Sequence, residues 1–362
     1  MEINARKILE EAQNMKASDI YIVAGKPACF KIAGRIMPIT QEPLRPTDTN
    51  RLVTELYSLA VYVDEHSRSI KNLDSGDDDF ALNLSNLGRY RVNAYKQRHS
   101  LSAIIRTVPV EIPNPMELNI PEIVVNLANY TRGIVLVTGT TGSGKTTTLA
   151  CLIDKINRER ECHIVTIEDP IEFNYKHNKG IVSQRELNSD TKDYAAALRS
   201  VLRQVPDVIL VGEMRDYETI SSAITVAETG HLVFSTLHTI GAAATIDRII
   251  DVFPPNQQNQ IRSQLAYTLQ AVVSQQLIPT VDGKLHPAYE IMIVNDAIRN
   301  LIRESKTFQI ENVIQTSAAV GMRSMDMSIY DLYRTRMISK ENALLYSVDS
   351  RAMSARVGGQ LR

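Results

Sequence analysis

Nine consecutive residues have the types and the spacing needed to hold a nucleoside triphosphate. They are Gly139, Thr140, Thr141, Gly142, Ser143, Gly144, Lys145, Thr146 and Thr147. The first eight fit the pattern G-x-x-x-x-G-K-[ST], in which glycines let backbone N–H groups curl around phosphate oxygens. Lys145 is expected to reach the terminal phosphates, and the Thr146 hydroxyl to ligate Mg²⁺. The sequence therefore predicts a site for a nucleoside triphosphate with Mg²⁺ as cofactor.

Such a loop has to be held between a strand and a helix. Gly133 is followed by the unbroken apolar run 134–137, which is typical of a buried parallel strand. A helix after the loop is indicated by apolar residues at helical spacing, namely Leu149, Leu152, Ile153 and Ile156. The alternative is a Gly-Ser turn before an ordinary helix.

A second strand end supplies an acid. The apolar run 208–211 is followed by Gly212 and Glu213, so the carboxylate is expected where ligands bind in open α/β sheets. This arrangement is typical of a Walker B segment, whose acid holds Mg²⁺ directly or through water. The alternative is a solvated glutamate that ends a strand.

Three acids follow a further predicted strand, 164–167. They are Glu168, Asp169 and Glu172. Acids that face a triphosphate need metal and water between them, and we expect Glu172 to orient the attacking water. Such a cluster by itself is more often a solvated turn, and its place beside the strand of the phosphate loop favours the catalytic interpretation.

Two histidines flank the predicted strand 232–235. His231 and His238 are seven residues apart on an extended segment, which disfavours joint metal ligation. One of them is a candidate for a hydrogen bond near the γ-phosphate, and a purely structural role is the alternative for each.

The N-terminal part contributes cations around one predicted strand. A phosphoryl-transfer site often uses an extra arginine, from the same chain or from a neighbour. The candidate arginine fingers are Arg89, Arg91, Arg98 and Arg106. A solvated or ion-paired strand face is the alternative.

Composition describes an ordinary globular protein. The 362 residues are 44% hydrophobic with a formal net charge of -1, which gives no overall field to attract nucleic acid or anionic lipid. Three cysteines without a C-x-x-C pair disfavour disulfides and a cysteine-rich zinc site. No secretory signal or membrane-length apolar run is apparent, so we expect a cytoplasmic protein that meets the membrane only through a partner.

The chain is expected to be an α/β protein with two domains. Apolar strands that alternate with helices predict a parallel sheet with right-handed crossovers in the larger domain. The smaller α+β domain is expected to include a helix at 50–66 and an acidic loop at 73–79. The predicted segments are a domain at 1–107, a proline-rich linker at 108–121, a domain at 122–349 and a disordered tail at 350–362.

In this order the motifs resemble those of the ATPases that drive type II secretion and type IV pili. The resemblance is carried by the acid box 166–173, the Walker B segment 208–216 and the histidine box 229–239, in addition to the phosphate loop. It implies a PAS-like N-terminal domain, a RecA-like ATPase domain and a homohexameric ring. It also implies that Glu172 is the catalytic glutamate and that Glu213 organises the metal.

Within this superfamily the chain resembles the retraction ATPases of type IV pili, the PilT-like group. Residues 297–304, Ala-Ile-Arg-Asn-Leu-Ile-Arg-Glu, match a helix of that group, and amphipathic packing is the alternative explanation. The long N-terminal region and four-cysteine zinc element typical of extension and secretion ATPases do not occur in the sequence. Val205 is a departure, since the family usually has a polar or acidic residue there.

The leading hypothesis is thus a hexameric motor that retracts type IV pili by ATP hydrolysis. Its expected partner is an inner-membrane pilus platform protein, and its expected place is the cytoplasmic face of that membrane. The alternatives are an extension or type II secretion ATPase of reduced size, and a scaffold that binds nucleotide without cleaving it. A DNA translocase is disfavoured because the basic residues lack interleaved aromatics.

Overall fold

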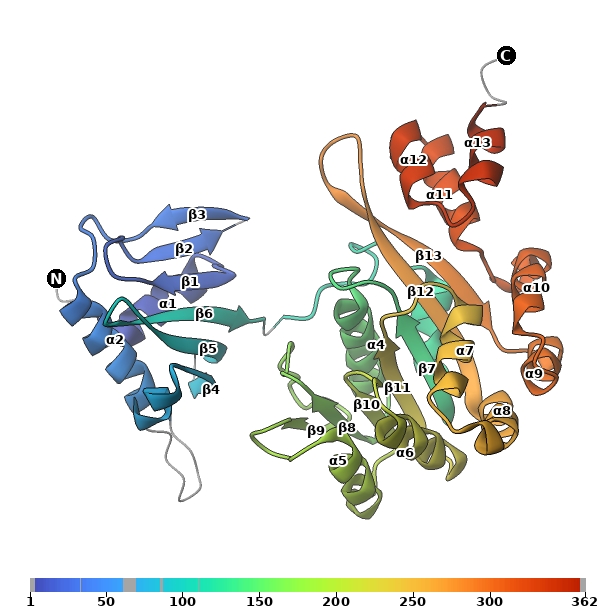
Figure 1. Ribbon diagram of the computed structural model, residues 1–362, viewed down its shortest axis with the longest axis horizontal. Coiled ribbons are helices and arrows are strands. Elements are labelled where there is room, and N and C mark those ends of the chain that lie inside the picture. The colour runs from blue at the N-terminus through green and yellow to red at the C-terminus, as the bar shows by residue number, and fades with distance from the viewer. Residues whose placement is uncertain (1–3, 33, 61–69, 85–86, 110, 359–362) are drawn as a thin grey trace. The chain divides into compact units, whose positions relative to one another are not determined.

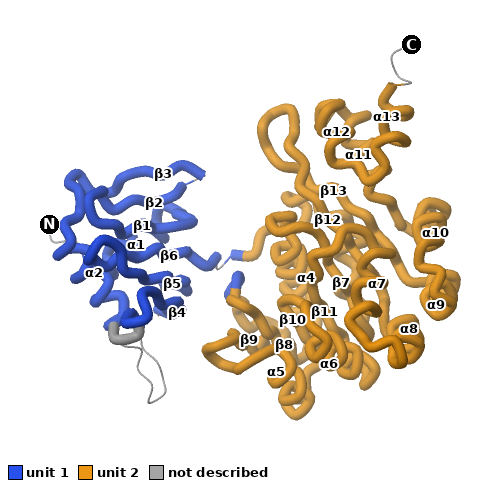
Figure 2. Tube along the Cα trace, in the orientation of Figure 1, with its two compact units in different colours: residues 1–111, 172–174 blue, residues 112–171, 175–362 orange. Residues whose placement is uncertain are grey.

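The computed structural model describes residues 4–32, 34–60, 70–84, 87–109 and 111–358. The chain divides into two compact units, residues 1–111 with 172–174 and residues 112–171 with 175–362 (Figure 2). The boundary between them lies within the proline-rich segment 108–121. The sequence contained no signal that residues 172–174 group with the first unit.

The first unit is a sheet with two helices. In chain order its elements are α1 (Ala5–Asn14), β1 (Asp19–Ile22), β2 (Cys29–Ile32), β3 (Arg35–Pro38), α2 (Pro46–Leu59), η1 (Ile70–Ser75), β4 (Asp77–Leu84), β5 (Gly88–Gln97) and β6 (Ser100–Val108). The described strands form one antiparallel sheet in the order β3-β2-β1-β6-β5-β4 (Figure 1).

Two elements of this unit differ from the sequence-based expectation. The helix expected at 50–66 begins at Pro46, whose ring suits the first turn, and ends at Leu59. Residues 61–69 lie outside the described part of the chain. The acidic segment 73–79 is not wholly a loop, because β4 begins at Asp77 and pairs with β5.

The core of the first unit lies between the sheet and its two helices. Ile8 and Leu9 of α1 and Leu56 of α2 pack in one buried cluster with Tyr90 of β5. The Tyr90 hydroxyl donates to the Leu9 carbonyl oxygen at 3.1 Å, and burial raises the pKa of Tyr90 to about 12. The face of this sheet that is turned away from α1 and α2 therefore carries the polar side chains.

The second unit contains the larger sheet. In chain order its elements are α3 (Glu122–Val125), η2 (Asn126–Asn129), β7 (Gly133–Thr138), α4 (Lys145–Glu159), β8 (His163–Glu168), β9 (Ile181–Glu186), α5 (Tyr194–Val201), η3 (Leu202–Gln204), β10 (Val208–Val211), α6 (Tyr217–Glu228), β11 (Leu232–Leu237), α7 (Ala242–Asp251), α8 (Pro255–Thr268), β12 (Leu269–Pro279), β13 (Leu285–Ile293), α9 (Asp296–Arg303), η4 (Thr307–Gln309), α10 (Ile310–Thr316), η5 (Ala318–Val320), α11 (Met325–Arg334), α12 (Lys340–Tyr346) and α13 (Ser350–Gly358).

The strand order in this sheet is β13-β12-β7-β11-β10-β8-β9 (Figure 1). β13 runs antiparallel to β12, and the other neighbours are parallel. The four strands predicted from apolar runs are confirmed as β7, β8, β10 and β11. Because these four are parallel, the segments that follow them emerge at one edge of the sheet, called here the carboxyl edge.

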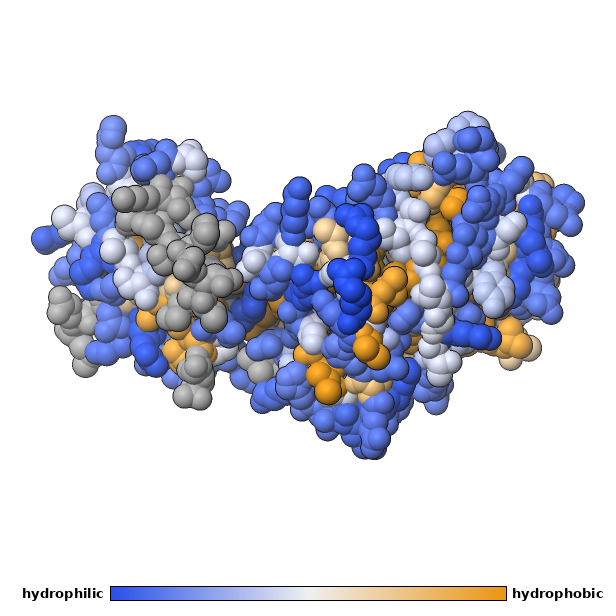
Figure 3. Space-filling view, turned by 90° about the horizontal axis from the view of Figure 1, so that it is seen from below, coloured by the Kyte–Doolittle hydropathy of each residue, from blue (hydrophilic) through white to orange (hydrophobic). Residues whose placement is uncertain are grey.

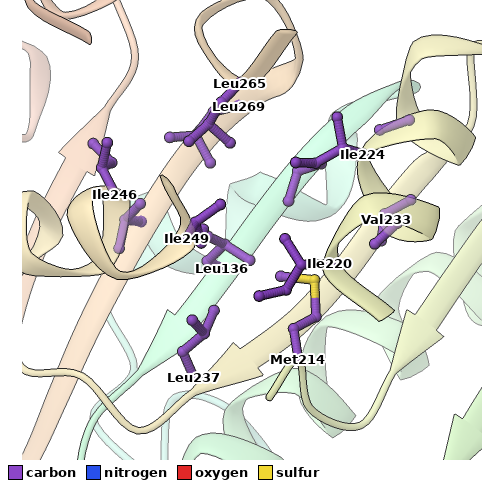
Figure 4. Packing of buried hydrophobic residues seen from close by; sticks show 14 of the residues in the cluster. Leu136, Met214, Ile220, Ile224, Val233, Leu237, Ile246, Ile249, Leu265 and Leu269 are labelled. Carbon is purple, nitrogen blue, oxygen red and sulfur yellow. The ribbon is translucent and has the colours of Figure 1, made fainter. Parts of the chain in front are cut away.

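Apolar helix faces hold these strands in place. Ile220 and Ile224 of α6 and Ile246 and Ile249 of α7 pack over the sheet face that includes Leu136 of β7 (Figure 4). Protein interiors are packed as densely as organic crystals, so these helices keep the strands in fixed positions. The loops at the carboxyl edge are therefore built on a rigid base.

The expected disordered tail at 350–362 is wrong for residues 350–358, which form α13. Met353 and Val357, one helical turn apart, are fully buried in a cluster with side chains of α11 and α12. The glycines and arginines of the segment suggested disorder, but this apolar pair provides a packed face. Residues 359–362 lie outside the described part.

The surface is of an ordinary kind. On the face seen in Figure 3, apolar residues form small separate groups within a mainly hydrophilic surface. Among the described residues, no helix has both the length and the apolar character that crossing a membrane requires.

Candidate nucleotide-binding site

The predicted phosphate loop joins β7 to α4 at the carboxyl edge. Gly139, Gly142 and Gly144 have φ angles of 139°, 80° and 89°, which ordinary residues rarely adopt. α4 begins at Lys145, and no described side chain caps its N-terminus. A helix N-terminus without a side-chain cap is suited to bind an anion.

The polar side chains of the loop are also suited to phosphate. Lys145 is only 8% exposed, and its Nζ donates to the carbonyl oxygens of Gly139 and Thr140, both at 2.9 Å. The Ser143 hydroxyl is buried and has no hydrogen-bond partner among the described residues. Buried polar groups normally have partners, so Ser143 fits a loop built to bind a ligand.

Glu213 follows β10 and lies between an arginine and a histidine. Its Oε1 lies 2.7 Å from Arg215 Nε, and its Oε2 lies 3.3 Å from His238 Nε2. The structure thus brings Glu213 and His238 together, because β10 and β11 are parallel neighbours in the sheet. Sequence reasoning missed Arg215, although its position two residues after Glu213 was a usable signal.

Steric contact explains why a glycine, Gly212, precedes Glu213. A Cβ atom on Gly212 would lie 2.8 Å from the Tyr194 hydroxyl oxygen, too close for any real side chain. Burial raises the pKa of Tyr194, and the negative charge of Glu213 raises it further. Tyr194 therefore stays protonated beside Glu213.

The acid box follows β8, the next strand in the sheet. Glu168 is buried, and its Oε1 accepts a hydrogen bond from the Thr166 hydroxyl at 2.6 Å and one from Gln184 Nε2 at 3.3 Å. Asp169 is exposed and precedes a cis proline bond. Glu172 is exposed and groups with the first unit. Glu168 is therefore held by hydrogen bonds at the carboxyl edge.

The two histidines lie at opposite ends of β11. His231 precedes the strand, and its Nδ1 is 3.0 Å from the Thr229 hydroxyl and 3.1 Å from the Val226 carbonyl oxygen. His238 follows the strand at the carboxyl edge. The structure does not bring His231 and His238 together, which agrees with the expectation that they do not share a metal.

Three of the candidate arginines share the polar face of the small sheet. Arg91 lies directly opposite Arg106 in the ladder, and Arg89 is two residues before Arg91 on the same strand. Arg106 Nε lies 3.0 Å from Asp19 Oδ1, and Arg91 is 4.0 Å from the Asp79 carboxylate. The fourth, Arg98, lies in the β5–β6 turn with a φ of 45°.

The side chains expected to hold Mg²⁺ supply oxygen atoms, which this hard cation prefers. Thr146 lies in the first turn of α4 and Glu213 follows β10, both at the carboxyl edge. Among the described residues, no group of three or more His, Cys, Asp or Glu side chains could hold a metal. A hydroxyl and a single carboxylate fit a magnesium ion that shares its coordination with phosphate and water.

The sheet order, the loop and the acids at one edge define a RecA-like P-loop ATPase with a smaller α+β unit before it, which confirms the predicted fold class. The family model described as "Type II/IV secretion system protein" matches residues 1–287. The chain belongs to that family.

Individual relatives agree with this assignment. The chain is 43% identical over 337 residues to "Type IV pilus retractation ATPase PilT" of Pseudomonas aeruginosa, covering 93% of this chain and 96% of the relative. It is 46% identical over 328 residues to "Twitching motility protein" of Neisseria gonorrhoeae, covering 90% and 85%. The crystal structure of the pilus retraction motor PilT with bound ADP superposes with a TM-score of 0.87 and 44% identity, covering 97% and 99%. The resemblance to PilT-like secretion ATPases is confirmed.

Proposed function

We propose that this chain is the ATP-hydrolysing motor that retracts type IV pili. The observation that carries the proposal is the phosphate loop, with Lys145 buried against it, in a chain whose relatives are named for pilus retraction and twitching motility. These relatives match this chain over most of their own length. The proposed activity therefore concerns the whole protein and not a single shared domain.

The residues of the site have distinct proposed roles. The amides of residues 139–147 and the Lys145 ammonium bind the phosphates, and Thr146 and Glu213 hold the ion. Bound Mg²⁺ offsets negative charge on the β- and γ-phosphates. Glu172 orients the attacking water and accepts its proton, and His238 donates a hydrogen bond beside Glu213.

The proposed assembly is a homohexamer in which arginines of one subunit reach the nucleotide of a neighbouring subunit. Arg89, Arg91 and Arg106 share one sheet face, where Arg91 and Arg106 approach the carboxylates of Asp79 and Asp19, and they are the candidates to reach a neighbouring copy's nucleotide. The ring is expected to work on an inner-membrane platform protein at the cytoplasmic face of that membrane. A net charge of -1 favours protein partners over nucleic acid.

Two measurements test this function. Purified protein should hydrolyse ATP only when Mg²⁺ is present, and phosphate release at background with tight nucleotide binding would instead identify a scaffold. Deletion of the gene in its host should leave excess surface pili and abolish twitching. Loss of surface pili would contradict retraction and favour extension.

A further inference from the structure

Strand β12 continues beyond the end of the strand that precedes the phosphate loop. Ser274 pairs with Thr138, the last residue of β7, and β12 then runs on to Pro279. β12 and β7 lie side by side (Figure 1), and Gln275, the residue after Ser274, lies beside the loop itself. Its side chain is buried, with 3% of the residue exposed.

Gln275 contacts both ends of the phosphate loop. A Cβ atom on Gly139 would lie 2.2 Å from the Gln275 carbonyl oxygen, and one on Gly144 would lie 2.8 Å from Gln275 Nε2. Real Cβ atoms do not approach other atoms so closely. The first and last glycines of the motif are thus packed directly against one residue of a neighbouring strand.

The same side chain also holds the first turn of α4. Gln275 Oε1 accepts a hydrogen bond from the Thr148 hydroxyl at 2.8 Å, and both residues are buried. A buried hydrogen bond of this kind fixes geometry, because neither partner can exchange the other for water. The Gln275 carboxamide therefore bonds the first turn of α4 to the adjacent strand, and it lies directly against Gly144 at the end of the loop.

We propose that Gln275 is a positioning residue for the nucleotide. Its carboxamide accepts the Thr148 hydroxyl bond and packs against Gly144, so that the amides at the end of the loop keep the curve that receives phosphate oxygens. This inference rests on the proposed function, because it assumes that the loop binds MgATP. Without Gln275 the loop should bind MgATP less well in the ground state and the transition state alike, which raises KM and changes kcat little.

Gln276 offers a matched control. It is the same residue type at the next position of the same strand, it is half-buried, and its Nε2 lies 3.5 Å from the Tyr346 carbonyl oxygen. Successive strand residues point to opposite faces, so Gln276 faces away from the loop. A change in general strand packing should affect both variants, whereas a change in nucleotide positioning should affect only Gln275.

The test is steady-state ATP hydrolysis by the full chain, with MgATP concentration varied. Gln275→Ala should raise KM for MgATP about tenfold and change kcat less than about threefold, and Gln276→Ala should change either less than about twofold. An unchanged KM in Gln275→Ala, with wild-type hydrolysis intact, would overturn the inference alone. A wild-type protein that neither binds nor hydrolyses ATP would overturn the proposed function, and the inference with it.

A second pair of variants covers the case in which Gln275→Ala does not fold. Thr148→Val removes the hydroxyl and should raise KM as Gln275→Ala does, and Thr148→Ser should restore a KM near the wild-type value. If the Thr148–Gln275 hydrogen bond were purely structural, Thr148→Val would have a lower melting temperature and an unchanged KM. That result would also overturn the inference.

Discussion

Glu213 and His238 face each other at the carboxyl edge of the large sheet, with 3.3 Å between Glu213 Oε2 and His238 Nε2. They are 25 residues apart in the chain and meet because β10 and β11 are parallel neighbours. Arg215 Nε approaches the other oxygen of the same carboxylate at 2.7 Å. The acid proposed to hold Mg²⁺ is thus oriented by two cationic or hydrogen-bonding side chains.

Glu213→Gln should lower kcat about 100-fold, because an amide cannot supply the charge that holds the ion and the variant loses its pair with Arg215. The Kd for ATP without Mg²⁺ should change little, since the loop is untouched. Rates over a range of Mg²⁺ concentrations check this, with Glu218→Gln, an exposed acid in α6, as the control. Wild-type turnover at every Mg²⁺ concentration would remove Glu213 from the metal site.

Glu172→Gln should retain MgATP binding and lower kcat about 100-fold or more, because the amide cannot accept a proton from water. Single-turnover hydrolysis separates this step from binding. Glu161→Gln, which changes an exposed acid between α4 and β8, is the control. If the Glu172 variant hydrolyses ATP at the wild-type rate, its assignment as the catalytic glutamate is wrong.

Glu290 should make the stability of the second unit depend on pH. Burial raises its pKa above the ordinary 4.5, and the charges of Glu311 and Asp326 raise it further. Hydrogen bonds from the backbone N–H groups of Ala242, at 2.7 Å to Oε1, and of Met325 lower this pKa but do not cancel the rise. Between the ordinary and the raised pKa the folded state binds more protons than the unfolded state, so stability falls as pH rises through that interval.

Glu290→Gln stays neutral and can still accept the bond from Ala242, so its stability should not fall in this way. Melting temperatures of both proteins, measured from pH 4.5 upward, check the difference. If the melting temperatures of the two proteins change equally with pH, Glu290 does not titrate between the ordinary and the raised pKa.

Met353→Ala should destabilise the C-terminal helices, because Met353 is fully buried and such truncations cost about 2–5 kcal/mol. Hydrogen exchange of α11–α13 reports the local effect. Ser354→Ala, at the exposed neighbouring position, should leave exchange unchanged. Equal, fast exchange in the wild type and both variants would mean that α13 does not pack.

Local patterns predicted much of the large sheet. The strands β7, β8, β10 and β11 are continuous apolar runs, since helices cover both faces of a parallel sheet. β9 was missed because Ser183, Gln184 and Arg185 interrupt its apolar pattern at the edge of the sheet. Asp282 and Gly283, a pair typical of hairpin turns, lie between the antiparallel strands β12 and β13.

Only part of the candidate site could be predicted from local sequence patterns. The residues 139–147 are contiguous, so their spacing alone predicts the loop. Glu213 and His238 could each be placed after a predicted strand, but their contact was not predicted, because it depends on the order of the strands in the sheet. Gln275 had no such signal, because it is a polar residue within a strand whose contact with Thr148 spans 127 positions. Contacts of that range depend on the tertiary fold.

The central claim is that the phosphate loop binds MgATP, and calorimetric titration of the full chain tests it most directly. We expect a clear binding heat for the wild type and for Lys155→Ala, whose lysine lies on α4 and pairs with Glu159. Lys145→Ala should bind at least about 100-fold more weakly, because it loses the ammonium that meets the phosphates. Well-folded wild-type protein that gives no heat, or a Lys145 variant that binds as tightly as the wild type, would contradict the account.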